Sequence, residues 1–411
     1  MHLPHAPHTA YTTGFYPDEG RDFSVRILLG LCNSGAADAG EIFTTIANLK
    51  DGHGQEWFDT WLTLGRRIRS EADASSAAGH RISAAWAYLR AATYLSQAVD
   101  AVDGLESDEQ RLPVFHEHRD AWEKFVDNGP FRAHRLTIPY EDTTLPGWFL
   151  APEHATAGAL RPTLVVINGS DGCVSDQWSS AARGALLRGY NVVLYDGPGQ
   201  QSMLFDHDVP FRPDWEAVQT PVTAVVLQQE GVDPDRLALY GISQAGYWVP
   251  RSLAYEHRYA AAVADPGVVD VSSSWLEHLP KSLRAELEAG EQEKFDRNMA
   301  IGMKMSKDTK QQWDWRSRPY GTSGFYETYK AVEQYRITPE IAALIGTPIL
   351  ITSPEQEQFW PGQADKLASL SGDKTEVVEF TAAEGASWHC QPMGRGLTEQ
   401  RMFDWLDEML A

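Results

Sequence analysis

The sequence predicts an α/β protein, in which helices flank a mostly parallel central sheet and a helical N-terminal domain precedes it. Two observations carry this prediction. Apolar residues recur with a helical period in the first 130 residues, and short apolar runs alternate with helical stretches from residue 131 onward. Short apolar strands separated by helices are typical of a parallel sheet that is covered on both faces.

The N-terminal domain is expected to span residues 1–130. Residues 57–68 and 80–98 each repeat their large apolar side chains near a helical period of about 3.6 residues, so each helix would bury one face. No phosphate-binding glycine motif, paired-cysteine motif or internal repeat occurs in this part of the sequence.

The second domain is expected to span residues 131–411 and to open with a hairpin around the polar turn at residues 141–144. Six further strands, most of them separated by helices, are expected. The strands fall at residues 163–168, 191–196, 236–241, 260–265, 347–352 and 375–380, and helices at 178–188, 215–229, from about 245, and 397–410.

A helical and charged insertion is expected at about residues 268–344, between the fourth and fifth of these strands. In an open α/β sheet such an insertion can lie at the carboxyl edge of the strands, where ligands bind. It would then act as a lid. The alternative is a decoration that makes no contact with substrate.

The acidic composition argues against several classes of function. The net charge is −22 and no Lys/Arg-rich run offsets it, so we expect no binding to nucleic acid or to anionic membranes. The three cysteines have no metal-ligand spacing and are expected to be free thiols. His2, His5 and His8 have no acidic partner at ligand spacing, so neither a metal nor another cofactor is expected. Without a signal-peptide pattern or an apolar stretch of about 20 residues, the protein is expected to be cytoplasmic.

The motif Gly-Ile-Ser-Gln-Ala-Gly at residues 241–246 predicts a nucleophile at Ser243. It follows an expected strand and precedes an expected helix, which is the setting of a G-x-S-x-G nucleophile elbow. The tight reversal strains the serine backbone and requires small neighbours. Ala245 stands where the second glycine is usual, and it is small enough for the turn. The hydroxyl would then lie at a helix N-terminus, which favours developing negative charge.

His389 is the expected base for this hydroxyl, because a serine is a weak nucleophile until a base takes its proton. In this order of elements the base lies in the loop between the last strand and the last helix. His389 falls in that loop and is the only histidine after His278.

A carboxylate that orients the imidazole and stabilises its cation is expected as the third member. It usually follows the strand before the last, where the sequence offers Glu355 and Glu357. Pro361, which would start the next helix, favours Glu357. Asp265, at the end of the preceding strand, is a third candidate, although it could equally belong to a plain turn.

Acyl transfer also requires hydrogen-bond donors for an oxyanion. The backbone N–H of Gln244, directly after the nucleophile, is one candidate. The second is the N–H of Ser170 in the turn after the first parallel strand, where Gly169 would allow close approach.

The order of these motifs resembles one group of α/β-hydrolases. The segments are YLRAATYL (88–95), NGSDG (168–172), YDGPGQ (195–200), GISQAG (241–246), PEQEQFWPGQ (354–363) and EGASWHCQ (384–391). The group contains the dihydroxypseudooxynicotine hydrolase, fungal hydrolases that shorten polyketides, and related esterases. The resemblance implies the α/β-hydrolase fold, with the N-terminal helical domain as a cap beside the catalytic domain. It also implies a homodimer, as is common in the group.

Three departures from the group's pattern concern the elbow, a loop and the acid. Ala245 replaces the usual glycine, and Gln201 replaces the glycine that usually ends the DGPGQG segment. Glutamate stands at the acid position where aspartate is frequent, which leaves the choice between Glu355 and Glu357 open.

The expected function is therefore a serine-dependent hydrolase. It would act on an ester or on a carbon–carbon bond next to a ketone, in an aromatic or polyketide-like small molecule. Tyr88, Arg90, Tyr94 and Tyr247 are candidates for substrate binding, and each could instead be structural. One alternative is an eliminase, lyase or cyclase that uses His389 as a base without an acyl-enzyme. The other is a non-catalytic binding protein on a hydrolase scaffold.

Overall fold

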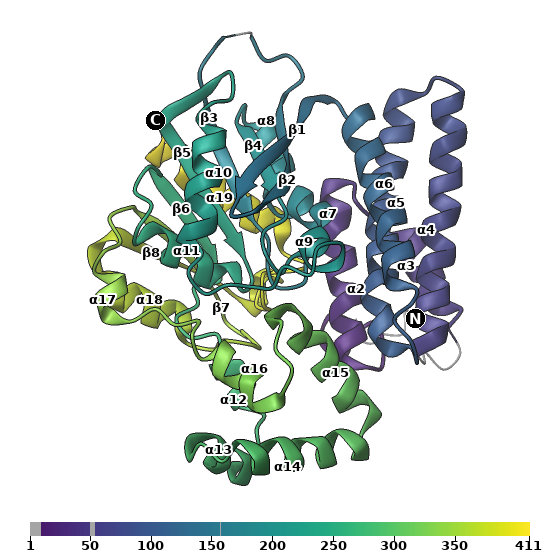
Figure 1. Cartoon of the computed structure of the whole chain (residues 1–411). Helices are drawn as coiled ribbons and strands as arrows, with labels where there is room; N and C mark the ends of the chain where they lie inside the picture. The colour runs from purple at the N-terminus through teal and green to yellow at the C-terminus, as the bar shows by residue number, and fades with distance from the viewer. Residues whose placement is uncertain (1–9, 50–53, 157) are drawn as a thin grey trace, which may run out of the picture.

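The computed structural model describes residues 10–49, 54–156 and 158–411, and it confirms the predicted fold class (Figure 1). A bundle of helices stands on one side of a twisted sheet, and a helical insertion extends below both. The helices of the N-terminal part are α1 (Ala10–Thr13), α2 (Glu19–Leu31), α3 (Ala39–Ala47), α4 (Gly54–Ala77), α5 (Arg81–Ala101) and α6 (Arg111–Asn128).

Side-chain caps explain where two of these helices begin. Asp18 precedes α2 and accepts a hydrogen bond from the N–H of Arg21. Asp38 precedes α3 and accepts from the N–H groups of Gly40 and Glu41. An aspartate at this position satisfies N–H groups that the first helical turn leaves without a partner.

The sheet has eight strands in the order β1-β2-β4-β3-β5-β6-β7-β8. The β1–β2 hairpin and the β2–β4 pair are antiparallel, and all other neighbours are parallel. The strands are β1 (Phe131–Tyr140), β2 (Thr143–Pro152), β3 (Arg161–Ile167), β4 (Asn191–Tyr195), β5 (Val232–Ile242), β6 (Ala261–Asp265), β7 (Ile349–Pro354) and β8 (Thr375–Phe380). Each expected strand is present, with ends that differ by a few residues.

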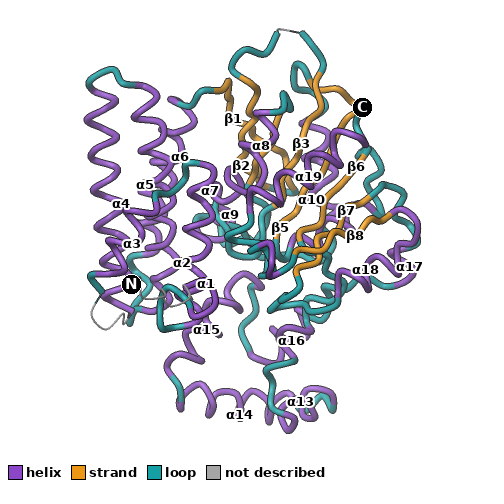
Figure 2. The backbone as a smooth tube through the Cα atoms, turned by 180° about the vertical axis from the view of Figure 1, so that it is seen from behind, coloured by secondary structure: helices purple, strands orange, loops and turns teal. Residues whose placement is uncertain are grey.

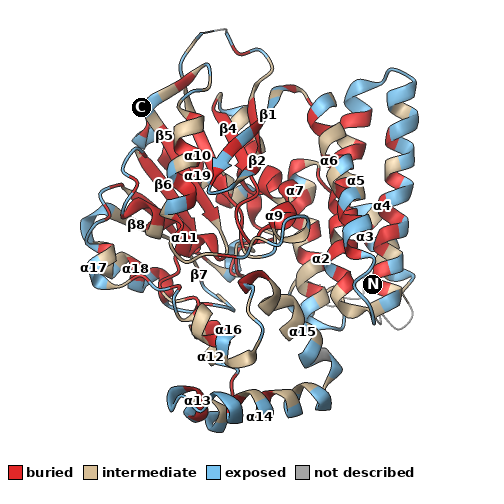
Figure 3. Cartoon of the chain, in the orientation of Figure 1, coloured by how far each residue is buried: buried red, intermediate tan, exposed pale blue. Residues whose placement is uncertain are grey.

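Helices cover both faces of the sheet, which is why its strands read as continuous apolar runs. Successive residues of a strand point to opposite faces, so Val165 belongs to one core and Val166 to the other. Every residue of β4 and β6 is buried, and β3 is buried from Thr163 onward (Figure 3). The covering helices are α7 (Val174–Gln177), α8 (Arg183–Leu187), α9 (Gln201–Phe205), α10 (Glu216–Val226), α11 (Ala245–Leu253), α18 (Gln363–Ser371) and α19 (Arg395–Met409). A π-helical turn at Trp178–Ala182 joins α7 to α8.

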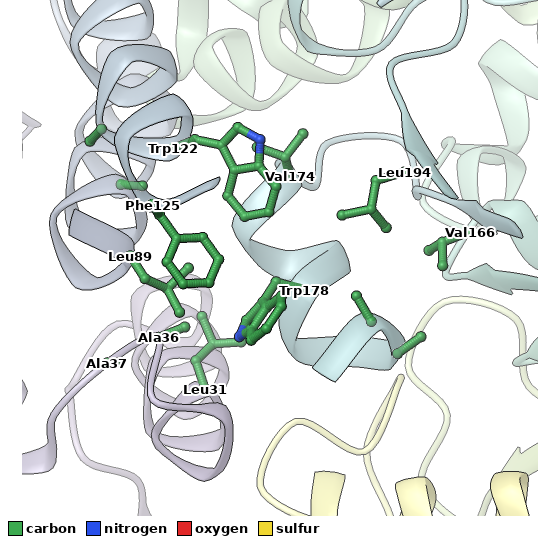
Figure 4. Packing of buried hydrophobic residues seen from close by; sticks show 14 of the residues in the cluster. Leu31, Ala36, Ala37, Leu89, Trp122, Phe125, Val166, Val174, Trp178 and Leu194 are labelled. Carbon is green, nitrogen blue, oxygen red and sulfur yellow. The ribbon is translucent and has the colours of Figure 1, made fainter. Parts of the chain in front are cut away.

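One of the two cores is continuous from the sheet into the N-terminal helices. Trp178 is only 2% exposed and lies between the helical part and the sheet (Figure 4). Its ring contacts Phe125 edge-on at 4.8 Å between centroids, and Leu89 lies close by. Leu194 of β4 belongs to the same core. This shared core holds the N-terminal helices firmly against one face of the catalytic half.

The insertion between β6 and β7 is helical, as expected, and lies at the carboxyl edge of the sheet (Figures 1 and 2). Its helices are α12 (Ser273–Leu276), α13 (Lys281–Glu288), α14 (Gln292–Met305), α15 (Lys307–Ser317), α16 (Phe325–Val332) and α17 (Pro339–Ala342). The segment around α15 also contacts the N-terminal part, since Gln311 donates to the carbonyl of Gly104 at 3.0 Å. Among the described residues, no helix is both long enough and apolar enough to span a bilayer.

Candidate active site

Ser243 lies in the sharp turn between β5 and α11, with a left-handed backbone φ of +57°. This conformation is unfavourable for any residue with a side chain, and it is held here by a hydrogen bond from the Ser243 N–H to the carbonyl of Asp265, at 2.6 Å. The turn has the geometry of a nucleophile elbow, which projects the serine from the carboxyl edge of the sheet.

Close packing around the elbow explains its pattern of small residues. A Cβ added at Gly246 would lie 1.7 Å from the carbonyl oxygen of Pro266, so glycine is required there. A Cβ added at Gly241 would lie 2.9 Å from that of Ala245. The alanine that departs from the usual motif therefore fits, because Gly241 leaves room for its methyl group.

The structure brings Ser243, His389 and Glu357 together from three loops. His389 Nε2 lies 3.0 Å from Ser243 Oγ, and its Nδ1 lies 2.9 Å from each carboxylate oxygen of Glu357. Glu355 points elsewhere, since its Oε2 accepts from the N–H of Ala382 at 2.7 Å. Of the two glutamates left open by the sequence, Glu357 is the one that contacts His389.

Burial and charge set the protonation of this pair. Burial raises the pKa of Glu357, but the charge of His389 and hydrogen bonds from His389 and from the N–H groups of Phe359 and Trp360 lower it by more, so the pKa lies below its usual range. Burial lowers the pKa of His389, but Cys390 and Glu357 raise it by more, and the pKa lies above its ordinary value. The carboxylate is therefore ionised and ready to stabilise an imidazolium.

Asp265, the third acid candidate, does not contact His389 in the structure. It supports the elbow that carries Ser243. It is fully buried and forms an ion pair with Arg395 at 2.9 Å. Tyr240 and Thr352 also donate to its carboxylate, at 2.9 and 2.7 Å. Burial raises the pKa of Asp265, but Arg395 and these hydrogen bonds lower it by more. Its carboxylate is occupied by structural partners, while its carbonyl holds the elbow.

The expected oxyanion donors lie beside the nucleophile. A Cβ added at Gly169 would lie 2.9 Å from the Cβ of Ser243, so only glycine lets this loop approach. The Gly169 N–H is bound by Asn168 Oδ1 at 2.9 Å. The N–H groups of Ser170 and Gln244 have no acceptor among the hydrogen bonds of the described residues, and both residues line the cavity in front of Ser243. Two free donors next to a nucleophile can stabilise an oxyanion.

The N-terminal helix α2 packs directly on the loop between β8 and α19. The guanidinium of Arg26 lies 3.9 Å from the ring centroid of Trp388, and Phe23 stacks on the same ring at 6.4 Å. A Cβ added at Gly30 would lie 1.6 Å from the carbonyl oxygen of Pro392. These contacts hold the loop that carries the predicted base, so the N-terminal part is an integral part of the site.

A cavity of about 260 Å³ opens in front of Ser243. Its walls come from the N-terminal helices, from loops at the carboxyl edge of the sheet, and from α12 and α15 of the insertion. The wall is rich in aromatic side chains: Phe23, Phe205, Trp275, Trp315, Tyr320 and Phe359. The insertion therefore contributes directly to the space in which a substrate would bind.

The four residues predicted to bind substrate do not line this cavity. Arg90 and Tyr94 of α5 both bind Glu41, at 3.1 and 2.7 Å, and Tyr88 of the same helix donates to a neighbouring carboxylate at 2.7 Å. Tyr247 of α11 donates to a backbone carbonyl at 2.9 Å. All four are structural. The cavity wall is formed instead by aromatic and charged residues of α2 and of the insertion, which the sequence did not single out.

The described part of the chain contains no group of three or more His, Cys, Asp and Glu side chains arranged to hold a metal. His2, His5 and His8 lie outside the described residues. The reaction proposed for this site uses only protein side chains, backbone N–H groups and water.

Comparisons with known proteins agree with the fold. The model of the prolyl oligopeptidase family matches residues 178–309, which include the elbow. The chain is 28% identical over 410 residues to hydrolase LUC6 of Fusarium sp, covering 96% of this chain and 97% of the relative. It is 24% identical to the 20-hydroxy-prefusarin hydrolase FUS2 of Gibberella moniliformis, over 98% of both chains. The crystal structure of the 2,6-dihydroxy-pseudo-oxynicotine hydrolase superposes with a TM-score of 0.71 at 20% identity, covering 93% of this chain and 95% of that one.

The fold and these relatives make the protein an α/β-hydrolase. It is an enzyme, and it is similar along nearly its whole length to fungal hydrolases and to the 2,6-dihydroxy-pseudo-oxynicotine hydrolase.

Proposed function

We propose that the enzyme cleaves a carbonyl substrate through an acyl-enzyme on Ser243, with His389 as base and the ionised Glu357 as the carboxylate that orients His389. The observation that carries this proposal is the continuous hydrogen-bonded chain from Ser243 Oγ to His389 Nε2, at 3.0 Å, and from His389 Nδ1 to Glu357, at 2.9 Å. These distances suit direct proton transfer and the orientation of the imidazole.

In the proposed mechanism, the Ser243 hydroxyl passes its proton to His389 Nε2 as the oxygen attacks the substrate carbonyl. The N–H groups of Gln244 and Ser170 bind the resulting oxyanion. The bond to the leaving group breaks as His389 returns the proton to it. A water molecule, deprotonated by His389, then attacks the acyl-enzyme in the same way. This step releases the carboxylic acid product and restores the Ser243 hydroxyl.

The proposed substrate is an aromatic or polyketide-like small molecule with an ester, or with a carbon–carbon bond next to a ketone. The aromatic cavity supports this, since flat apolar rings bury well against such walls. The similarity to a 20-hydroxy-prefusarin hydrolase and to a 2,6-dihydroxy-pseudo-oxynicotine hydrolase points in the same direction.

Labelling with a fluorophosphonate, followed by mass mapping, tests the nucleophile. We expect one adduct on Ser243, and hydrolysis of a short-chain nitrophenyl ester that is lost in Ser243→Ala and in His389→Ala. Ser70→Ala, which changes an exposed serine on α4, is the matched control and should retain both properties. Turnover of the ester by Ser243→Ala at the wild-type rate would reject the acyl-enzyme and favour the use of His389 as a base alone.

A further inference from the structure

Four carboxyl groups line the cavity in front of Ser243, and three of them have partners. Asp103 is held by two arginines: Arg111 at 2.8 Å and Arg318 at 2.5 Å. Asp171 accepts from the hydroxyl of Ser170 at 2.8 Å.

The other two carboxyl groups, those of Asp176 and Asp100, differ in whether they have a hydrogen-bond partner. Asp176 accepts from the N–H of Cys173 at 2.9 Å, at the start of α7. Asp100 forms no hydrogen bond and no ion pair through its side chain with any residue that the structure describes. Asp100 is accessible and lines the cavity, so its carboxyl group is available to a ligand there.

The position of Asp100 is unfavourable for a negative charge. It lies in the last turn of α5, where the carbonyl ends of the helix disfavour an anion. Desolvation by the surrounding protein raises the pKa of Asp100 well above its ordinary value. The nearby carboxyl groups of Asp171, Asp176 and Asp103 raise the pKa further, and Arg111 lowers it by less. A residue that costs stability in the free protein and opens into the active-site cavity is a candidate for ligand recognition.

Two other polar side chains in the cavity wall, those of Gln244 and Arg316, are available to a ligand. Gln244 is 4% exposed, lines the cavity beside the nucleophile, and its Nε2 has no hydrogen-bond partner among the described residues. Arg316, also in the wall, lies 4.5 Å from the ring centroid of Trp275 and donates to Ser274. Arg316 could attract an anionic ligand, so the experiment below includes one.

Aromatic rings also line this cavity. Phe205, Trp275 and Trp315 line the same cavity as Asp100. The faces of such rings attract ammonium groups, and an unpaired carboxylate in the same cavity can supply the counter-charge. Two of these rings already bind arginines, Arg111 over Phe205 at 5.7 Å and Arg316 over Trp275.

We propose that the substrate of this enzyme carries a basic nitrogen, and that Asp100 receives it as an ammonium group while the carbonyl lies at Ser243. This inference rests on the proposed function for the position of the carbonyl. A bound cation would favour the ionised form of Asp100 and would relieve the unfavourable setting of that residue.

Calorimetric titration of the full chain with three ligands that share a phenyl ring on a four-carbon chain tests the proposal without requiring turnover. The ligands are 4-phenylbutylamine, 4-phenylbutanol and 4-phenylbutanoate, which present a cation, a neutral hydroxyl and an anion. We expect the amine to bind on the order of tenfold more tightly than the alcohol, and the anion most weakly. In Asp100→Asn this preference for the amine should disappear.

Asp108→Asn is the matched control, because it removes the same charge from an exposed position outside the cavity lining and should preserve the preference. Asp100→Asn should also raise the melting temperature, since it relieves an unfavourable charge, whereas loss of a purely structural residue would lower it. Asp100→Ala provides a second variant should the asparagine variant fold poorly.

Tighter binding of the anion or the alcohol, absence of amine binding at millimolar concentration, or an unchanged preference in both Asp100 variants would each overturn the proposal. Failure of the proposed function has a different signature. Ser243 would then remain unlabelled by the fluorophosphonate, whatever the order of ligand affinities.

Discussion

Replacing Glu357 with glutamine keeps the size of the side chain but changes which ring nitrogen of His389 carries the proton. Glu357 Oε1 accepts from the N–H groups of Phe359 and Trp360, at 2.9 and 3.2 Å. The amide oxygen of the variant must therefore stay at this position, and its NH₂ group takes the place of Oε2, 2.9 Å from His389 Nδ1. The amide then donates to Nδ1 and fixes the ring proton on Nε2. That proton faces Ser243, so the imidazole can no longer act as its base.

The expected loss is about 10⁴-fold in kcat, as for the corresponding change in other serine triads, or about 5.5 kcal/mol of transition-state stabilisation. Solvent does little to reduce this value, because the side chains of His389 and Glu357 are only 5% and 6% exposed. The measurement is kcat on a nitrophenyl ester, alongside fluorophosphonate labelling of Ser243.

Glu355→Gln is the matched control for this experiment. Its carboxylate is exposed and binds only the N–H of Ala382 among the described residues, so kcat should stay within about twofold of wild type. A loss of less than tenfold in Glu357→Gln, or an equal loss in Glu355→Gln, would refute the assignment of the acid.

Three further outcomes are expected. Asp265→Ala leaves Arg395 buried without its partner, so the free energy of unfolding in urea should fall by about 3–5 kcal/mol; a change below 1 kcal/mol would contradict the pairing. Gly246→Ala places a methyl group 1.7 Å from the Pro266 carbonyl oxygen, and should cost about 1–3 kcal/mol of stability together with most of the esterase activity. The pKa of His389 is raised above 6.5, and only its neutral form accepts the serine proton, so kcat/KM should fall as the pH drops through a value above 6.5. A pH–rate profile whose optimum lies at acidic pH would contradict the use of neutral His389 as the base.

The positions of the strands along the chain, and those of Ser243 and His389, could be predicted because local patterns mark them. A strand end followed by small residues and a helix is visible within the six residues 241–246. Among the acids, the local pattern favours Glu357 through Pro361 but does not exclude Glu355 or Asp265. The partner that occupies Asp265 is Arg395, which lies 130 residues away and carries no local signal.

The substrate-binding prediction failed for a related reason. Tyr88, Arg90 and Tyr94 lie on α5, which is buried on nearly all sides, so no apolar stripe reveals which face meets the cavity. Only the end of that helix, at Asp100, reaches the cavity. Its role depends on the absence of a partner in three dimensions, which a sequence does not record.

The packing of α2 has a consequence for protein engineering. Exchange of the N-terminal helices with those of a relative is an attractive way to alter selectivity, since these helices wall the substrate space. Gly30 has no clearance from Pro392, and Arg26 covers Trp388, so a foreign helix with a larger residue at either place would push against the histidine loop. A chimera that keeps both positions native can change its selectivity and retain its rate. One that does not would lose turnover before any new preference could be measured.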